Sequence, residues 1–412
     1  MSVLDSTGAP LGRLLQYPGF TRFLSARLLA LVAVQMQTVA VGWQVYAITG
    51  KPLDLGLIGL SQFLPFVLLV LPAGHVADRH NRAAILALCI ALEFFCALAL
   101  LAFTLSGLEV AWPVFAVMVV FGVARAFSMP AGQAIMPNLV PPSLFSRAVA
   151  VNSSTWQVST IVGPAIGGLV YLAGPDIVYA SVAGLLAAAF LLVVGVRTEK
   201  PERPEQPDGW RTLLVGLRFV WRRKVILGAV SLDLFAVLFG GAVALLPAYA
   251  SDILHVGPDG FGWLRAAPGI GAAIVAMFLA WRPITRHVGA KMFGGVALFG
   301  AATVVFGLSH EFFVSLAALI VIGASDMVSV YIRHMLVQLE TPDGIRGRVS
   351  AVNAVFIGAS NELGEFESGL TAAWWGLKPA VVVGGLASIA IAVIWTKWFP
   401  ALRRIDEFPR PK

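Results

Sequence analysis

Residues 141–152 read PPSLFSRAVAVN, and residues 342–353, which lie 201 positions later, read PDGIRGRVSAVN. The two stretches share a proline at the start, an arginine in the middle and the tripeptide AVN at the end. The same offset aligns three glycine pairs, and an offset of 203 aligns Gly59 with Gly262 and Pro65 with Pro268. Because the matching residues keep nearly the same offset, the sequence predicts two similar halves whose helices follow in the same order. The three pairs are Gly122 with Gly323, Gly163 with Gly364 and Gly168 with Gly369.

The composition indicates a membrane protein. Of the 412 residues, 58% are hydrophobic and 12% are charged, which a soluble domain does not show. Apolar runs of about 20 residues or more recur between short clusters of Gly, Pro or charge. Because lipid offers the backbone no hydrogen-bond partner, each run is expected to be a helix. The sequence predicts an all-α integral membrane protein with twelve transmembrane helices in two pseudo-symmetric six-helix bundles, at residues 20–48, 56–77, 83–106, 112–138, 144–172, 176–197, 224–251, 260–281, 288–309, 312–338, 346–376 and 378–399.

The longest polar stretch separates the two bundles. Residues 197–212 read RTEKPERPEQPDGWRT, and the arginine-rich segment that follows has apolar residues on one side, as expected of a helix on the membrane surface. We expect an N-terminal bundle at residues 1–197, a cytoplasmic linker with an interfacial helix at 198–223, and a C-terminal bundle with a cytoplasmic tail at 224–412. The first span is too long for a cleavable signal peptide, so no segment is expected to be removed.

The distribution of basic residues predicts the topology. If the N-terminus is inside, the Lys and Arg residues outside the spans all lie in inner loops and tails except Lys51 and Lys378. This bias predicts a bacterial inner-membrane protein with both termini in the cytoplasm. It also explains the net charge of +7 without nucleic acid. Cys89 and Cys96 share one apolar helix and are expected to be packed thiols, so no metal or cofactor is predicted.

The loop between the second and third spans carries a family resemblance. Residues 74–82 read GHVADRHNR, which resembles the signature loop of the major facilitator superfamily, and Gly74, Asp78, Arg79 and Arg82 match its pattern. The resemblance implies a conformational latch in which Asp78 faces the start of the eleventh span, near Arg346 and Arg348. The glycine would allow close helix approach. The mirrored loop at 281–291 keeps the basic residues but lacks the Gly and the Asp.

A second motif lies in the fifth span. GPAIGG, at residues 163–168, resembles the antiporter motif of exporters in the same superfamily, and the matching residues are Gly163, Pro164, Gly167 and Gly168. The proline bends the helix, and the glycines are expected to pack tightly against the other half as a seal against leakage. The alternative is an ordinary interface of small residues. The motif favours export over import.

Longer stretches, such as SLDLFAVLFGGAVALLPAYA at residues 231–250, resemble the branch of the superfamily that contains the enterobactin exporter. The resemblance implies a secondary active efflux transporter that works by alternating access, with a small organic molecule, siderophore-like or drug-like, and protons as partners. The chain is expected to act as a monomer in the lipid bilayer. A lipid or amphiphile transporter is the alternative, and a receptor or channel is disfavoured by the repeat. An enzyme is disfavoured because no catalytic constellation or phosphate-binding loop recurs near a span end.

Ionisable residues inside the spans are candidate functional residues, because each costs at least ~2.5 kcal/mol at the bilayer centre without a partner or a water-filled surrounding. Arg27 and Arg265 lie near span ends, where long side chains can reach the membrane surface. Arg125 occupies the position equivalent to Asp326 in the repeat, and it could instead pair with Glu93 on a neighbouring helix. The remaining intramembrane charges are Asp233, Arg333, Glu362, Glu365 and Glu367.

Three of these acids lie within NELGEFESG, at residues 361–369. In the repeat, this segment of the second half occupies the position that GPAIGG occupies in the first half. At about 100° per residue, Glu362 and Glu365 share a helix face, whereas Glu367 is turned about 140° from Glu362. The pair is expected to look into the substrate cavity, and Glu367 to bond a neighbouring helix. Carboxylates shielded from water can bind and release protons, so the proton-coupling candidates are Glu362, Glu365, Asp233, Glu93, Arg125 and Asp326.

Polar residues of the first span are the candidates for the substrate cavity. An aromatic side chain with several amides suits a bulky, partly apolar solute. The cavity candidates are Gln35, Gln37, Trp43 and Gln44, with Thr38 nearby.

Overall fold

The computed structural model describes residue 14, residues 16–196 and residues 209–409. Within these ranges, the side chains at positions 71, 75, 78, 209–214, 343, 344, 346–348, 350, 351 and 354 lie outside the description. The secondary structure of the described residues is entirely helical, and each of the twelve expected spans coincides with a helix. The all-α class predicted from the composition is therefore confirmed.

Six long helices make up the first half, and several of them begin at a proline, whose fixed φ suits the first helical turn. They are α2 (Pro18–Thr49), α3 (Pro52–Arg79), α4 (Arg82–Leu105), α5 (Trp112–Ile135, followed by the short η1, Met136–Asn138), α6 (Pro142–Tyr171) and α7 (Pro175–Val194).

The second half begins with the short helix α8 and contains one interrupted span, which breaks after Phe239 at Gly240 and Gly241. Its elements are α8 (Gly209–Arg222), α9 (Lys224–Phe239), η2 (Ala242–Leu245), α10 (Leu246–Asp252), α11 (Pro258–Trp281), α12 (Val288–Leu308), α13 (Phe312–Glu340), α14 (Asp343–Trp375), α15 (Leu377–Trp398) and α16 (Pro400–Arg403).

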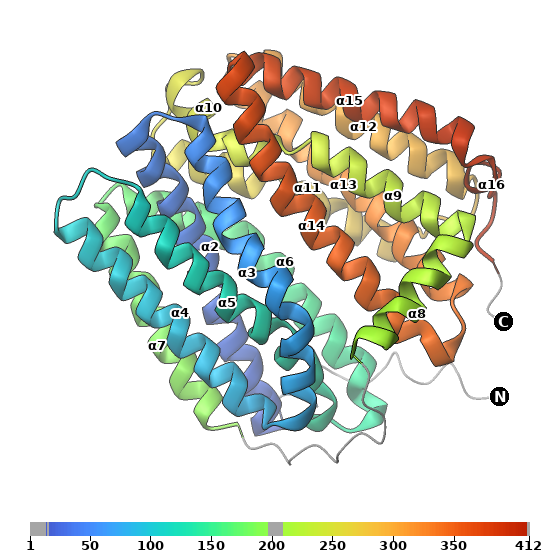
Figure 1. Ribbon diagram of the computed structural model, residues 1–412, viewed down its shortest axis with the longest axis horizontal. Helices are drawn as coiled ribbons and strands as arrows, with labels where there is room; N and C mark the ends of the chain where they lie inside the picture. Colours follow the sequence, from blue (N-terminus) through green and yellow to red (C-terminus); the bar gives the residue numbers. More distant parts are fainter. Residues whose placement is uncertain (1–13, 15, 197–208, 410–412) are drawn as a thin grey trace. The chain divides into compact units, whose positions relative to one another are not determined.

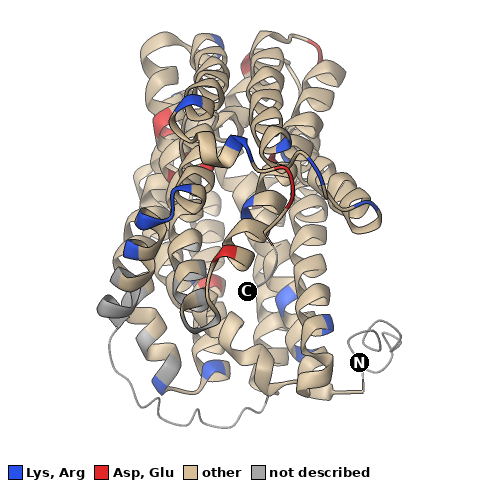
Figure 2. Cartoon of the chain, turned by 90° about the vertical axis from the view of Figure 1, so that its right-hand side faces the viewer, with Lys and Arg blue, Asp and Glu red and all other residues tan. Residues whose placement is uncertain are grey.

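Ten segments of the described chain are long and apolar enough to cross a membrane, with α9 to α10 counted as one. The two expected spans that are missing from this set are α6 and α14, although they have 30 and 33 residues. Both carry many polar side chains, and the three glutamates lower the hydropathy of α14. The protein is therefore a multi-pass membrane protein in which two long helices are unusually polar. Figure 2 shows how few positions elsewhere carry charge.

The described residues divide into two compact units. The first contains residues 64–108 and the described parts of 1–41 and 112–207, and in it α4 packs against α5 and α7. The second contains residues 42–63, 109–111 and the described part of 208–412. In the second unit α12 lies beside α13 and α15, and α14 lies beside α9 and α15 (Figure 1). The bundle boundaries expected from the linker stay a prediction.

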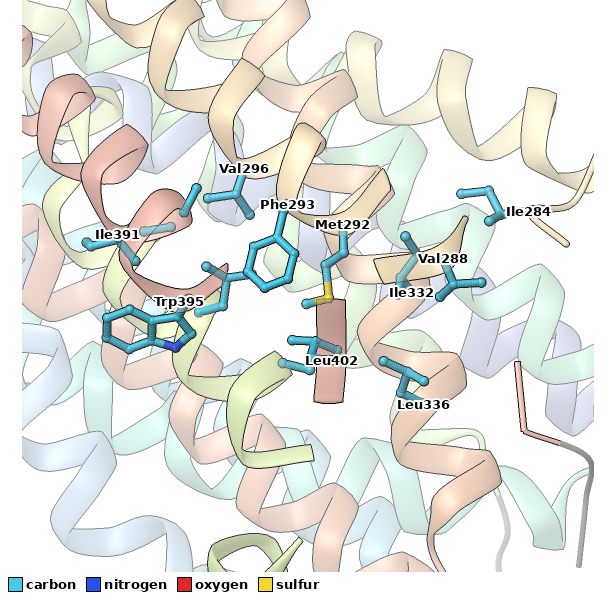
Figure 3. Packing of buried hydrophobic residues seen from close by; sticks show 14 of the residues in the cluster. Ile284, Val288, Met292, Phe293, Val296, Ile332, Leu336, Ile391, Trp395 and Leu402 are labelled. Atoms are coloured by element: carbon cyan, nitrogen blue, oxygen red, sulfur yellow. The ribbon is translucent and has the colours of Figure 1, made fainter. Parts of the chain in front are cut away.

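A large apolar cluster holds one end of the second unit together (Figure 3). Met292 and Phe293 of α12 lie at its centre, and Trp395 of α15 and Leu402 of α16 close it from the C-terminal side. Ile405 and Phe408, which follow the last helix, pack against the same cluster. The C-terminal tail is therefore part of the packed unit up to Phe408.

The tail also caps α12. At the equivalent helix start in the first half, the Asn81 side chain accepts hydrogen bonds from the amides of Ala83 (2.9 Å) and Ala84 (3.2 Å). At α12, His287 adopts φ 57° and its side chain caps nothing. Its amide instead donates to Oδ1 of Asp406 (3.0 Å), and the amide of Val288 donates to the Asp406 carbonyl (3.1 Å). The tail thus supplies at α12 the cap that Asn81 provides at α4.

The Asp406→Ala variant is expected to lower the free energy of unfolding by about 0.5 to 2 kcal/mol, because it removes an acceptor at a helix N-terminus. Thermal unfolding of the purified protein in detergent measures this. The control is Glu407→Ala, because Glu407 lies 3.7 Å from Arg286 with both side chains exposed and should contribute about 0 to 1 kcal/mol. Equal shifts for the two variants would contradict the capping role.

Candidate functional site

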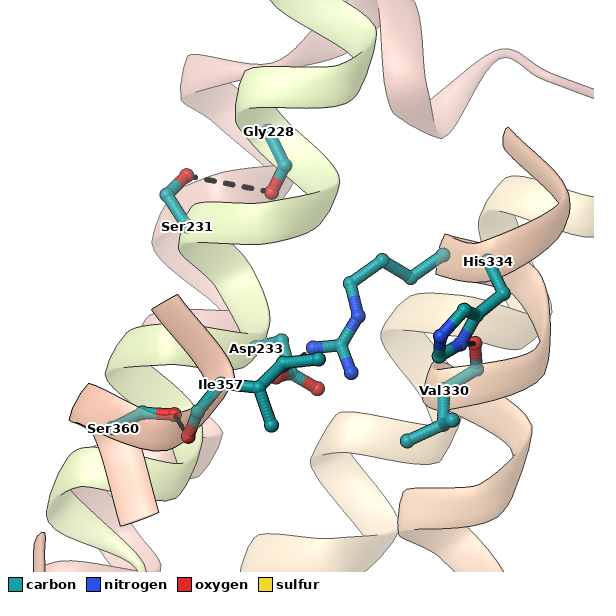
Figure 4. Close-up of polar contacts among 8 residues, drawn as sticks. Gly228, Ser231, Asp233, Val330, His334, Ile357 and Ser360 are labelled. Carbon is teal, nitrogen blue, oxygen red and sulfur yellow. Dashed lines mark hydrogen bonds and ion pairs between the residues drawn. The ribbon is translucent and has the colours of Figure 1, made fainter. Parts of the chain in front are cut away.

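A buried ion pair joins two helices of the second unit. Nη1 of Arg333 on α13 pairs with Oδ2 of Asp233 on α9, and the two side chains are only 2% and 6% exposed (Figure 4). Nε of Arg333 is also buried and has no hydrogen-bond partner among the described residues. The sequence identified both residues as intramembrane charges but did not pair them, because no spacing rule links residues on different helices.

Hydrogen bonds from α15 fix the position of α9 beside this pair. Nε1 of Trp395 donates to Oγ of Ser231 (3.0 Å), and Oγ of Ser388 donates to the Ala236 carbonyl (2.8 Å). His334, next to Arg333, turns its Nδ1 toward the Val330 carbonyl of its own helix (2.9 Å, Figure 4). The carboxylate of Asp233 is therefore held on a helix that is anchored on both sides of it.

A second acid–base pair lies in the first unit. Glu93 of α4 is 6% exposed, and the Arg125 guanidinium of the neighbouring α5 acts on its carboxyl group electrostatically. The same guanidinium lies 5.6 Å from the ring centre of Phe66 on α3, a distance suited to a cation–π contact. Arg125 thus acts on Glu93, as one of its two alternatives expects, and a shared role with Asp326 stays a prediction. Asp326, the other alternative, lies on α13 in the second unit.

The glycines of GPAIGG pack within their own half. A Cβ added to Gly163 of α6 would lie 3.2 Å from the Val32 carbonyl oxygen of α2, and one added to Gly167 would lie 2.9 Å from Cα of Met36. For Gly163 and Gly167 the described contacts are therefore with a helix of the same half, and packing of the motif against the other half stays a prediction. The two glycines allow the backbone of α6 to approach α2, the first helix of the same unit.

The repeated glycine in the second half makes the equivalent contact. A Cβ added to Gly364 of α14 would lie 3.0 Å from the carbonyl oxygens of Val237 and Leu238 on α9, which is the first span of its half. Gly241 lies at the break after α9, and a Cβ added to it would lie 2.7 Å from the carbonyl oxygen of Gly364. The repeat found in the sequence thus corresponds to a repeated helix contact.

The start of α3 lies against α14 near its glutamates. A Cβ added to Gly59 would lie 2.7 Å from Oε2 and 3.1 Å from Cβ of Glu365, and one added to Gly369 would lie 2.9 Å from Cα of Gly56. Glu362, on the same face as Glu365, is 8% exposed. Glu365 is partly exposed, so a cavity role for this pair stays a prediction.

Glu367 does not bond a neighbouring helix within the described part of the chain. The bond recorded at this residue joins its backbone carbonyl to the Thr371 hydroxyl of the same helix (2.9 Å). Its side chain is partly exposed. The expected interhelical bond of Glu367 is not found.

The latch residues are described only in part. Nη1 of Arg82 donates to the Ala134 carbonyl (2.9 Å), which ties the start of α4 to the end of α5. A Cβ added to Gly74 would meet no atom of its own unit within 4 Å, so close packing inside the unit does not require this glycine. Arg79 is exposed. The latch stays a prediction, because it depends on three side chains outside the description, those of Asp78, Arg346 and Arg348.

The cavity candidates of α2 take part in helix contacts. Gln35 lies against Gly163, with Cγ 3.4 Å from an added Cβ, and Trp43 stacks on Phe261 of α11 with ring centres 5.7 Å apart. Gln37 is 2% exposed, and its Oε1 has no hydrogen-bond partner among the described residues. Gln44 is buried as well. A role in substrate binding stays a prediction for all four.

The fold and the repeated helix contacts define a class of membrane transporter, and comparison with known proteins agrees. Residues 23–365 match the model of the Major Facilitator Superfamily, so the chain belongs to this family of transporters, and it is not an enzyme.

Two curated relatives are efflux proteins. The chain is 26% identical over 393 residues to the multidrug efflux pump Tap of Mycolicibacterium fortuitum, covering 90% of this chain and 93% of the relative. It is 25% identical over 344 residues to the enterobactin exporter EntS of Escherichia coli, covering 82% and 81%. A bacterial homologue of the lysosomal transporter Spinster has a similar fold, with a TM-score of 0.71, 13% identity and coverage of 96% of this chain and 97% of that one.

Gly364→Val is expected to lower the melting temperature and the yield of folded protein, because its branched side chain would meet the carbonyl oxygens of α9 and overpacking costs about 1 to 3 kcal/mol. Gly294→Val on α12 is the matched control, since an added Cβ there meets nothing within 4 Å. Size-exclusion profiles and thermal unfolding in detergent compare the two. If Gly294→Val destabilises the protein as much, close helix approach is not the cause.

Removing only one charge of the Asp233–Arg333 pair should destabilise the protein more than removing both charges. Arg333→Met leaves Asp233 buried without its partner, for which a loss of about 3 to 5 kcal/mol is typical, whereas Asp233→Asn combined with Arg333→Met removes both charges. The double variant is therefore expected to melt at a higher temperature than Arg333→Met alone. A double variant that is no more stable would argue against a buried pair.

Proposed function

We propose that this protein is a proton-coupled antiporter that exports a small organic molecule across the bacterial inner membrane. Its membership of the superfamily supports a transporter, and its resemblance to Tap and EntS supports the outward direction. The excess of Lys and Arg in the inner loops supports cytoplasmic termini. We further propose that one chain is the working unit, since each half already contains its own acid–base pair.

The observation that carries proton coupling is the buried Asp233–Arg333 pair. Charges inside a membrane-spanning bundle are costly, and they occur mainly where a transporter binds ions or protons. A proton on Asp233 would neutralise the carboxylate and remove its attraction for Arg333. Because the pair joins α9 to α13, protonation would loosen the contact between these helices. Proton uptake would thus be linked directly to helix packing.

Glu93 and Arg125 in the first unit are a second acid and base on neighbouring helices, where the exposed Arg125 acts electrostatically on the buried Glu93. Glu93 lies on α4 and Arg125 on α5, so protonation of Glu93 would change the contact between those helices. We propose that the two pairs are the principal coupling sites. Glu362 and Glu365 stay candidates, and Gly59 of α3 lies against Glu365 in this structure.

The transport cycle follows from these contacts. An acid that is reached from the outer side takes up a proton, and the change in helix packing weakens substrate binding there. The return movement exposes the acid to the cytoplasm, where the proton leaves and the charge pair forms again. One conformational change thus moves the substrate outward and the proton inward.

The test uses proteoliposomes and cells that lack other efflux systems, in which the substrate is found by an export screen. Asp233→Asn is expected to reduce pH-gradient-driven export at least about tenfold, while leaving substrate exchange without a gradient measurable, because the neutral side chain mimics the protonated state. Asp259→Asn, at the start of α11, is the control for removing an acid outside the pairs. Full pH-gradient-driven export by both Asp233→Asn and Glu93→Gln would refute coupling through these pairs.

A further inference from the structure

Arg27 of α2 is a cation that has no counter-charge among the described residues. Its guanidinium has no hydrogen bond or ion pair with any residue in the described part of the chain, and its Nε is buried. The side chain as a whole is partly exposed, so a ligand can reach it. The sequence favours a side chain that extends to the membrane surface, but the structure places Nη1 of Arg27 beside Gly132 of α5.

Two other arginines of the first unit donate hydrogen bonds from their guanidinium groups to backbone carbonyls. Arg22, five residues earlier on α2, donates to the Gly195 carbonyl after α7 (2.9 Å). Arg82 donates to the Ala134 carbonyl of α5 (2.9 Å). Both use carbonyl groups at helix ends, which lack partners within their own helix. In the described part of the chain, Arg27 has no such acceptor, although it lies on the same helix as Arg22.

Gly132 makes room for the Arg27 guanidinium. A Cβ added to Gly132 would lie 2.8 Å from Nη1 of Arg27. In the repeat, Gly132 corresponds to Arg333, whose charge is balanced by Asp233. Each half therefore places an arginine where its first and fourth spans meet, but only the second half supplies an acid there among the described residues. Within the described residues, the positive charge of Arg27 in the first half is therefore not balanced.

We infer that Arg27 is a binding position for the acidic group of an organic anion, such as a carboxylate or a phenolate. An arginine fork binds such groups through two parallel N–H donors. The position lies about nine residues from the inner start of α2, where an exporter would load its substrate. This inference rests on the proposed export function, because only an exporter would carry the bound anion across the membrane. It assigns organic anions as the substrate class, which the proposed function leaves open.

The binding test uses two dyes with one ring system and opposite charge, fluorescein as the anion and rhodamine 6G as the cation. Equilibrium dialysis against the purified protein in nanodiscs is expected to show saturable binding of fluorescein. Arg27→Gln should weaken this binding about tenfold or more, and Arg27→Lys less, because the charge is kept. Gly132→Val should resemble Arg27→Gln, since its side chain occupies the place of Nη1. Arg22→Gln is the matched control and should bind as the wild type does.

Three results would overturn the inference: no saturable binding of fluorescein, stronger binding of rhodamine 6G, or unchanged fluorescein binding in Arg27→Gln. Thermal unfolding shows that the variants fold and adds an independent readout. Arg27→Met should melt at the wild-type temperature or higher, because it removes a charge that has no internal partner. A lower melting temperature for Arg27→Met would mean that the arginine has a structural role. Binding at equilibrium needs no pH gradient, so failure of the proton-coupling experiment leaves this test intact.

Discussion

Contact between helix backbones is the constraint on which the two units depend. Inside lipid, apolar side chains gain little by leaving their surroundings, so helices associate through close packing and polar contacts. Gly163 brings α6 onto α2, and Gly364 brings α14 onto α9. Gly59 gives the same access to α3 for the acidic face of α14. These contacts position the two polar helices, α6 and α14.

Charge is the second constraint, and the two units meet it differently. In the second unit Asp233 and Arg333 neutralise each other out of contact with water. In the first unit Glu93 and Arg125 act on each other, whereas Arg27 has no acidic partner in the described chain. An unbalanced charge in a membrane protein is costly, so its persistence points to a ligand or to proton movement. The asymmetry gives the two halves distinct chemistry on a common helix arrangement.

Much of the fold could be predicted because lipid leaves the backbone few choices. The twelve apolar stretches coincide with helices, and the glycine register coincides with a repeated helix contact. The helix partners of the candidate site residues could not be predicted from the sequence. GPAIGG indicated tight packing, but it did not indicate that Gly163 and Gly167 contact α2 of their own half, and the spacing of the glutamates did not show that Gly59 of α3 lies against Glu365. A helical pattern shows which residues share a face, but it does not show which helix lies opposite.

The sequence by itself determined the class of protein, the helices and the twofold repeat, because these follow from local hydropathy and from residues at a constant offset. Only the tertiary structure decided the partner of each charge. It joined Asp233 to Arg333 across 100 residues, supplied Asp406 to the start of α12, and left Arg27 beside a glycine. The physical reason is that an ion pair or a cap depends on the distance between two atoms, which is fixed only when helices that are distant in sequence pack together.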